Sequence, residues 1–398
     1  MIELLELRQE NSKTHDLGGS QRQLHVSMGP IHYKDDYASG EKWKDIDLTW
    51  EDNRITRAPY ELTLEGKKCT IRNKKTGEVS TVELLDIGGK SLPDKAWEKS
   101  KGLARAPGIV GFDDVALDTD LEVVAENGAV RFTRVLKSDK APSEAKFKVT
   151  GNFRVRASDG DGELPVVSTL NDGVLTESLG LANRPIKYPV RIDPTWQVTA
   201  STDDCVTGYV NATFSVIDTI FWAGYRDATR QDQSSAARFL NITIPAGVTI
   251  DSAYFVLTAS SARTEATVNT RLRAEANVNP ATFSDAIDFD ARTWTTAPAL
   301  VNWDAIPAWS VDESGADTTS PDIATLVQTV IDLPGWVSGK NIVILWDDFE
   351  ERSTQADVTV RWAYSYNAST TKCPQLVITY TVPARKRWWL KGQLLMMG

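Results

Sequence analysis

Apolar and polar side chains alternate most clearly over residues 235–260. Pro245-Ala246-Gly247 interrupts this alternation, because proline lacks a backbone N–H and glycine accepts positive φ. On both sides of the interruption, β-branched and aromatic side chains occupy the positions that suit a pleated, half-buried surface. The pattern predicts two strands joined by a turn, and residues 198–382 are expected to be built around this pair.

The first half of the chain consists of shorter alternating runs separated by turn signals. The runs at residues 119–125 and 129–136 flank Glu126-Asn127-Gly128, and Asn-Gly between such runs is a strong hairpin signal. Further hairpins are predicted at residues 69–85, 153–164 and 164–179. Short strands with turns at intervals of roughly 8–12 residues are typical of a β-sandwich.

One segment of the second half has helical rather than strand periodicity. Ser320 is a suitable N-cap, Pro321 suits the first helical position, and Pro334-Gly335 ends the pattern. The apolar positions follow the i, i+3, i+4, i+7 rule: Ile323, Leu326, Val327, Val330 and Ile331. The predicted fold class is therefore all-β, with a β-rich, sandwich-like N-terminal region and a C-terminal jelly-roll-like β-sandwich that contains one short helix.

Four parts are predicted along the chain. They are a β-rich N-terminal region at 1–187, a linker at 188–196, a jelly-roll-like sandwich at 197–382 and a C-terminal tail at 383–398. Pro189 and Pro194 bracket the linker, and the residue before each proline is held extended. A polar stretch near 88–117 leaves open whether the N-terminal region forms one subdomain or two.

Composition excludes several classes of protein. The net charge of −10 argues against a nucleic-acid binder, which would present a basic face. The first residues are acidic and lack an apolar core segment, so no signal peptide is expected. No apolar run reaches the ~18 residues that a membrane span requires.

Cysteine and histidine are sparse. Cys69, Cys205 and Cys373 form an odd set, which is a poor disulfide framework. We interpret them as buried thiols, with a bond between Cys205 and Cys373 as the alternative. All three histidines lie within residues 15–32, so a histidine-based triad or metal cluster is not expected in the C-terminal part.

Tryptophans in a loop-rich stretch are the first candidates for binding. Trp294, Trp303 and Trp309 lie in residues 288–312, and loops commonly carry binding residues. Indole rings stack on the apolar C–H faces of sugars, so these three residues are candidate glycan contacts. The alternative is that they close the ends of a sandwich or form a subunit interface, where tryptophan is also enriched.

Acidic residues follow the predicted strand at 341–346. Asp347, Asp348 and Glu350 are candidate Ca²⁺ ligands. A pair of carboxylates at a strand end can also serve a glycosidase, and a solvated loop is the third interpretation. Residues 158–163 resemble half of a calcium loop, but their composition is more typical of a hairpin turn.

The C-terminal tail is basic and then apolar. Arg385, Arg387, Trp388 and Trp389 follow the last predicted strand. We interpret these residues as an assembly contact with a neighbouring subunit. A membrane-surface anchor is the alternative, because cationic, tryptophan-rich segments favour that location.

Several segments carry a resemblance to a known family. They are ASTDD at 200–204, RFLNITIPAGVTIDSAYFVLTA at 238–259, ARTWTTAPA at 291–299 and PQLVITYT at 374–381, with YPVRIDPT at 188–195 before them. Residues 188–382 resemble the DNRLRE-type β-sandwich modules, which are related to carbohydrate-binding modules of extracellular bacterial proteins. The resemblance implies a β-sandwich and a glycan ligand.

The whole chain also resembles structural proteins encoded in phage genomes, through ELRQENSKT at 6–14, GPIHYKD at 29–35 and WKDID at 43–47. That resemblance implies a virion component without enzymatic activity: a capsid decoration, head fibre or tail appendage. It would be a homo-oligomer, for example a trimer, that contacts other virion proteins and a host surface glycan, with no cofactor except Ca²⁺. The alternatives are an extracellular or cell-surface bacterial carbohydrate-binding protein and a glycan depolymerase.

Overall fold

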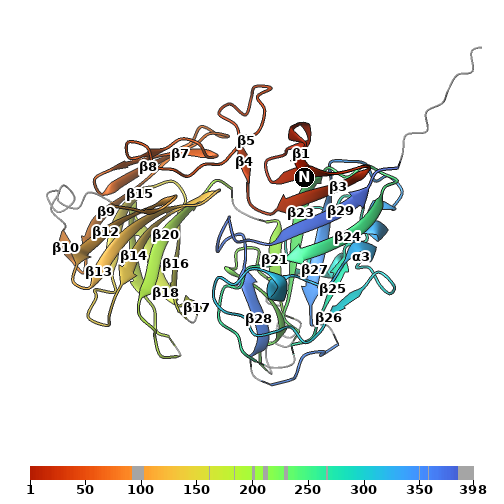
Figure 1. The fold of residues 1–398 in the computed structure, drawn as a ribbon. Helices are drawn as coiled ribbons and strands as arrows, with labels where there is room; N and C mark the ends of the chain where they lie inside the picture. Colours follow the sequence, from red (N-terminus) through yellow and green to blue (C-terminus); the bar gives the residue numbers. More distant parts are fainter. Residues whose placement is uncertain are drawn as a thin grey trace, which may run out of the picture.

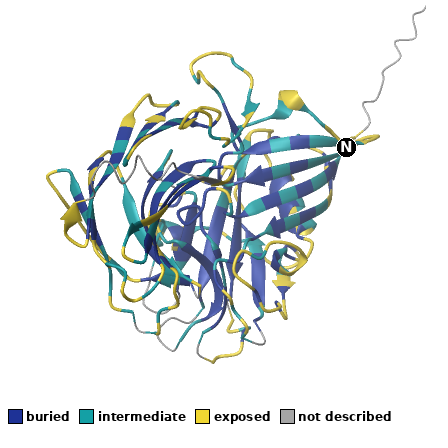
Figure 2. Ribbon diagram, turned by 60° about the vertical axis from the view of Figure 1, so that its left-hand side comes forward, coloured by how far each residue is buried: buried dark blue, intermediate teal, exposed yellow. Residues whose placement is uncertain are grey.

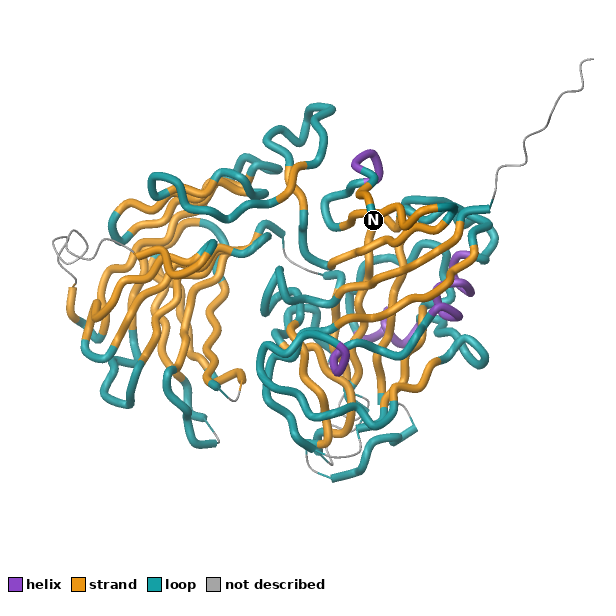
Figure 3. Tube along the Cα trace, in the orientation of Figure 1, coloured by secondary structure: helices purple, strands orange, loops and turns teal. Residues whose placement is uncertain are grey.

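The computed structural model describes residues 1–91, 103–160, 162–182, 184–199, 202–208, 214–227, 232–265, 268–348, 350–356 and 358–383. These residues form two β-sandwiches that lie beside each other (Figure 1). The predicted all-β class is confirmed, and Figure 3 shows that strands account for most of the ordered elements in both lobes.

The first sandwich is formed by two large antiparallel sheets. One has the order β18 (Val166–Asn171), β19 (Val174–Leu179), β15 (Ala145–Thr150), β9 (Val79–Ile87), β8 (Lys68–Asn73), β7 (Tyr60–Glu65) and β6 (Arg54–Ile55), with β10 (Lys90–Ser91) paired to β9. The other has the order β11 (Leu103–Ala106), β12 (Ile109–Ala116), β13 (Thr119–Ala125), β14 (Ala129–Leu136), β20 (Val190–Gln197), β16 (Arg154–Asp159) and β17 (Gly162–Leu164).

The hairpins predicted in this region are confirmed. Strands β8 and β9, β13 and β14, β16 and β17, and β18 and β19 are each paired antiparallel neighbours. Their inward side chains form one apolar core between the sheets, in which the rings of Phe132 and Phe147 meet edge to face at 5.8 Å. Turn chemistry and alternation together were sufficient to predict these pairs.

The predicted linker at 188–196 is wrong. Most of it is β20, a central strand that pairs with β14 on one side and β16 on the other. The ladder to β14 is interrupted across Pro194, which has no N–H to donate. Ile192 and Trp196 of this strand are buried, and burial of such side chains is what makes it part of the sandwich.

The second sandwich consists of two five-stranded sheets with shorter pairs beside them. One sheet has the order β1 (Ile2–Glu3), β2 (Ser12–Gly18), β3 (Gln21–Ser27), β29 (Gln375–Thr381) and β24 (Thr249–Val256). The other has the order β21 (Asp204–Thr207), β23 (Ser234–Ile242), β27 (Lys340–Asp347), β25 (Thr270–Ala274) and β26 (Val301–Trp303). The short pairs are β22 (Ile220–Tyr225) with β28 (Thr359–Tyr364), and β4 (His32–Tyr33) with β5 (Lys44–Asp45).

The N-terminal strands belong to this second sandwich, which the predicted boundary at residue 187 did not anticipate. Strand β3 pairs with β29, so that Leu24 lies opposite Ile378. Leu24 and Val26 alternate into the core of the second sandwich and are fully buried there. In Figure 1 these red strands lie among the green and blue strands of the C-terminal lobe.

The two strands predicted within residues 235–260 exist, but they do not pair with each other. Strand β23 pairs with β21 and β27, whereas β24 pairs with β29 in the opposite sheet. The turn at residues 245–247 therefore carries the chain from one layer of the sandwich to the other. The rings of Phe239 and Phe255 meet between the layers at 6.2 Å.

The predicted helix is present as α3 (Ala324–Ile331), but it begins later than predicted. Ser320 is not its cap, because the Ser320 hydroxyl accepts the Phe255 N–H at 2.9 Å. Asp322 accepts the Ala324 N–H instead. The described residues also contain a second helix, α2 (Ala286–Ala291), and the 3₁₀ turns η1 (Leu5–Leu7) and η2 (Ala316–Thr318).

A loop of the second sandwich, residues 365–373, joins it to the first, and residues 365–370 of this loop are buried. The Glu126 carboxylate accepts the Thr370 N–H at 2.9 Å and the Ser369 hydroxyl at 3.1 Å. Arg131 pairs with Glu126 and also donates to the Ala368 carbonyl. Because charged groups of one sandwich bond the backbone of the other, the two are held in a fixed relation.

Burial follows the strand pattern throughout. Figure 2 shows bands of buried and less buried positions along the strands of both sandwiches. Cys69, Cys205 and Cys373 are buried free thiols, as interpreted from the sequence. Among the described residues, no helix is long and apolar enough to cross a membrane.

Candidate functional site

The structure separates the three tryptophans that the sequence grouped together. Trp303 and Trp309 are 5% and 1% exposed and pack against Trp346 inside the second sandwich, with ring centroids 5.6 and 6.1 Å from that of Trp346. They are core residues, so their rings offer no face to a sugar. Trp294 is half-buried and lines a surface hollow.

This hollow, which we call the Trp294 hollow, has a volume of about 360 Å³, within the range of small-molecule sites. It lies against the sheet that contains β25 and β27. Its lining residues are Thr207, Gly208, Asp232, Ser234, Arg273, Ala286, Phe289, Asp290, Trp294, Leu345 and Asp347.

Trp294 is positioned by helix α2 and by an arginine. The side chain of Asp285 caps α2 by accepting the Asp288 N–H at 2.9 Å. The buried Arg292 bonds Asp288 on this helix and Glu275 beyond β25, each at 2.7 Å. This clamp holds Phe289 against Trp294, with ring centroids 5.4 Å apart, and so forms the aromatic wall of the hollow.

The hollow also has a polar part, which follows from strand register. Pairing of β25 with β27 places Arg271 directly opposite Asp347, and Arg273 shares the same strand face two residues later. Arg273 donates to Oδ2 of Asp347 from Nε at 2.9 Å and Nη2 at 2.6 Å, and Arg271 Nε donates to Oδ1 at 3.1 Å. The carboxylate and both guanidinium planes are therefore fixed before any ligand arrives.

Asp232 adds an acceptor to the same hollow. Its Oδ1 is buried, and among the described residues no hydrogen-bond donor reaches it. Burial, together with the negative charges of Glu351 and Asp347, raises the pKa of this carboxyl. A buried acceptor without a partner is costly, and a ligand hydroxyl donating to Asp232 would remove that cost.

The predicted Ca²⁺ ligands do not converge. Asp347 is held by two arginines, and Glu350 is exposed and lies beside Arg271 at 3.3 Å. Asp348 is buried and accepts the Ser353 N–H at 2.8 Å, and burial raises the pKa of its carboxyl to about 7. Within the part of the chain that the structure describes, no group of three or more acidic, histidine or cysteine side chains is arranged to hold a metal.

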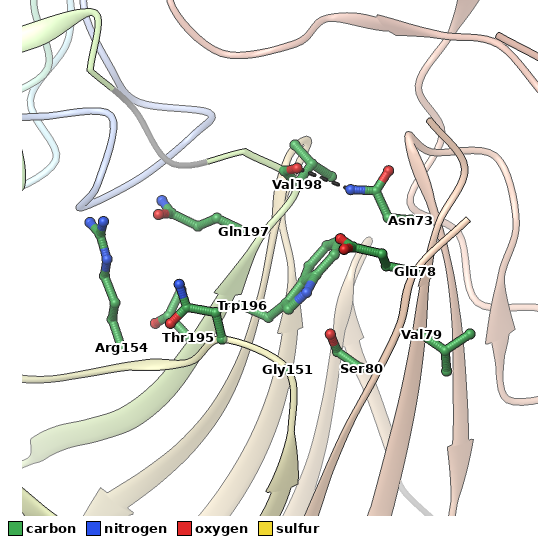
Figure 4. Close-up of a pocket in the computed structure, with 11 residues that line it drawn as sticks. Asn73, Glu78, Val79, Ser80, Gly151, Arg154, Thr195, Trp196, Gln197 and Val198 are labelled. Carbon is green, nitrogen blue, oxygen red and sulfur yellow. Dashed lines mark hydrogen bonds between the residues drawn. The ribbon is translucent and has the colours of Figure 1, made fainter. Parts of the chain in front are cut away.

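A second hollow lies at the end of the first sandwich, where the chain leaves β20 (Figure 4). Figure 4 shows Arg154 and Gln197 on one side and Asn73 and Glu78 on the other. Arg154 donates to Asn367 at 2.6 Å and Gln197 donates to the Tyr366 carbonyl at 3.2 Å. These polar groups connect the two sandwiches, and the indole of Trp196 is buried, so we assign this hollow to the junction.

Two further predictions concern other parts of the chain. Residues 158–163 belong largely to the β16–β17 hairpin, with Asp159 bonding Arg184 through both carboxylate oxygens at 2.7 Å. Arg385, Arg387, Trp388 and Trp389 lie outside the described residues, so their proposed assembly contact stays a prediction.

Sequence reasoning identified Trp294 and Asp347 but assigned them to different sites, and it missed Asp232, Arg271 and Arg273. The alternation Arg271-Leu272-Arg273, with the leucine fully buried, was the available signal, because it places two arginines on one face of a strand. Only the register of β25 against β27 shows which carboxylate they meet.

No family model matches the chain, and no curated protein matches it. Among solved structures, the chain is similar to a GH31 alpha-xylosidase from Xanthomonas citri, at 8% identity and a TM-score of 0.12. The alignment covers 94% of this chain and spans 37% of the xylosidase chain. A similarity of this size supports no argument about fold or function.

Proposed function

We propose that this protein is a structural component of a phage particle whose C-terminal sandwich binds a glycan, without cleaving it, in the Trp294 hollow. The observation that carries the glycan part is the pairing of an aromatic wall with fixed polar groups in one hollow. Trp294 offers a ring for the C–H face of a sugar, while Arg273 and Asp232 offer a donor and an acceptor for its hydroxyls. Small-molecule sites commonly combine apolar walls with a few well-placed polar groups.

The state of Asp347 favours binding over hydrolysis. A glycosidase needs two carboxyl groups that reach the sugar, one as acid and one as nucleophile or base. Three N–H groups already occupy Asp347, and its side chain is almost fully buried. It supports the polar wall and is poorly placed to exchange a proton with a substrate.

The binding part is tested on an array of bacterial surface glycans with the full chain, the Trp294→Ala variant and the Trp43→Ala variant. Trp43 is the matched control, because it is also half-buried but contacts Tyr37 and Lys34 at a distant place in the fold. Loss of a sugar-stacking ring should weaken binding at least tenfold in Trp294→Ala and leave Trp43→Ala unchanged. Equal binding by all three proteins would refute the site.

The particle part is tested separately, by density-gradient fractionation of the source culture and mass spectrometry of each band. We expect mass spectrometry to find the chain in the particle band at a stoichiometric amount. Recovery only in the cell envelope would reject the virion assignment and favour a bacterial surface carbohydrate-binding protein. Release of reducing ends from an array-positive glycan would instead favour the depolymerase alternative.

A further inference from the structure

Strand β18 is an exposed sheet edge of a kind that folded proteins normally avoid. Its six residues, VVSTLN, carry no charge, and five of them are exposed. Val167 and Leu170 are 56% and 59% exposed, although they point to opposite faces of the strand. The edge of a sheet presents unpaired N–H and C=O groups that template pairing with another chain, and charges or prolines usually block this.

The other edges of the four large sheets are short or covered. Strands β1 and β6 have two residues, β17 and β26 have three, and β11 and β21 have four. Strand β24 has eight, but Asp322 accepts its Ala253 N–H and Ser320 accepts its Phe255 N–H, both at 2.9 Å. For β18, the strand pairing within the described residues is to β19 alone.

We propose that β18 is a subunit interface that pairs antiparallel with β18 of a second copy of this chain. The strand is complementary to itself about a two-fold axis that passes between the two copies of Ser168. In that register, Val166 lies opposite Leu170 of the copy and Val167 lies opposite Thr169. Residues directly opposite each other in an antiparallel pair share a face and contact, so one face of the joined sheet gains two Val–Leu pairs and the other gains two Val–Thr pairs.

The absence of charge on β18 favours a second copy of the same strand as its partner. A strand with a basic or acidic edge would repel an identical strand, because like charges directly opposite each other are unfavourable. Here the opposed pairs are Val166 with Leu170, Val167 with Thr169 and Ser168 with its own copy, and none of these residues is charged. The pairing would join two eight-stranded sheets into one and would shelter both exposed apolar side chains.

The first test measures the molar mass of the full chain by light scattering and analytical ultracentrifugation over a concentration series. The wild type should form a dimer, and Ser168→Lys should weaken dimerisation at least tenfold, because the two lysines would then lie directly opposite each other. Val337→Lys, which places the same charge on an exposed residue outside β18, should behave as the wild type. A wild-type monomer at all concentrations would overturn the proposal.

An engineered disulfide between the two copies tests the register and distinguishes this interface from any other. Opposed residues have Cα atoms about 4.5–5.5 Å apart, which a disulfide can span. The Ser168→Cys variant should oxidise to a covalent dimer, whereas Leu170→Cys alone should not, since its two copies lie four residues out of register. The native cysteines are buried and should not interfere. Absence of the cross-link in a dimeric protein would overturn the register and the interface.

Discussion

Each sandwich holds a buried arginine–carboxylate group, and the two groups differ in what surrounds them. In the first sandwich, Arg134 and Glu177 are both 0% exposed and are joined at 2.9 Å. The remaining N–H groups of Arg134 donate to the carbonyls of Pro142 and Ser143 at 3.0 and 2.9 Å. In the second sandwich, Asp347 is equally buried, but Arg273 is 16% exposed and lines the Trp294 hollow.

The difference shows that accessibility, rather than residue type, separates a structural ion pair from a binding wall. Arg134 is closed in by its own sandwich, so its charge is used entirely to satisfy buried acceptors. Arg273 is also oriented by a carboxylate, but it lines a hollow that the aromatic ring of Trp294 lines as well. Substitutions in the two groups should therefore affect different properties.

The largest effect is expected from Arg134→Met. This change leaves Glu177 buried without its partner and leaves two backbone carbonyls without donors. Breaking a buried pair in this way typically costs about 3–5 kcal/mol. Urea unfolding of the wild type and variant would measure the loss of stability. A change below about 1 kcal/mol would be typical of a solvent-exposed ion pair and would contradict the buried role of Arg134.

An intermediate effect, and a pH dependence, are expected from Glu177→Gln. Burial raises the pKa of Glu177 to about 7, although Arg134 opposes that rise. A carboxyl with a raised folded pKa stabilises the fold below its ordinary pKa of 4.5 and loses that contribution as the pH rises toward 7.

Between pH 4.5 and 7.5, the wild type should therefore lose on the order of 2–3 kcal/mol from this group, and Glu177→Gln should not. The measurement is the free energy of unfolding of both proteins at several pH values. Identical pH profiles for the two proteins would show that Glu177 titrates normally.

The smallest effect on stability, but a clear effect on binding, is expected from Arg273→Met. Arg271 still bonds Asp347 in this variant, and the site is open to water, so the loss should be about 1–2 kcal/mol. Glycan affinity should fall at least tenfold. Arg238→Met is a matched control, since Arg238 has a similar exposure of 15% and pairs with Asp203 away from the hollow. A normal affinity in Arg273→Met would show that the polar wall does not take part in binding.

Local structure was the most predictable part of the chain. The turn Glu126-Asn127-Gly128 specifies its hairpin through backbone geometry, and the 323–331 periodicity specifies α3 through a buried stripe. Pairing of β3 with β29 could not be predicted in the same way, because nothing near Leu24 encodes a partner at Ile378. Strand β20 was mistaken for a linker because Pro189 and Pro194 suggested an interruption, whereas the strand pairs with a neighbour on each side.

The site was predictable only in part, for a similar reason. Trp294, Trp303 and Trp309 are the same residue type in the same stretch, and only the packed structure shows that two of them fill the core. The Arg271–Asp347 contact depends on the register between strands that are 65 or more residues apart in sequence. Sequence patterns predict which face a side chain occupies, whereas the partner across that face follows from topology.

The most direct test of the glycan site is a crystal structure of the full chain with a saccharide that binds on the array. We predict a sugar ring stacked on the indole of Trp294, with the sugar hydroxyls within hydrogen-bond distance of Arg273 and Asp232. A saccharide bound elsewhere, with the Trp294 hollow filled only by solvent, would contradict it.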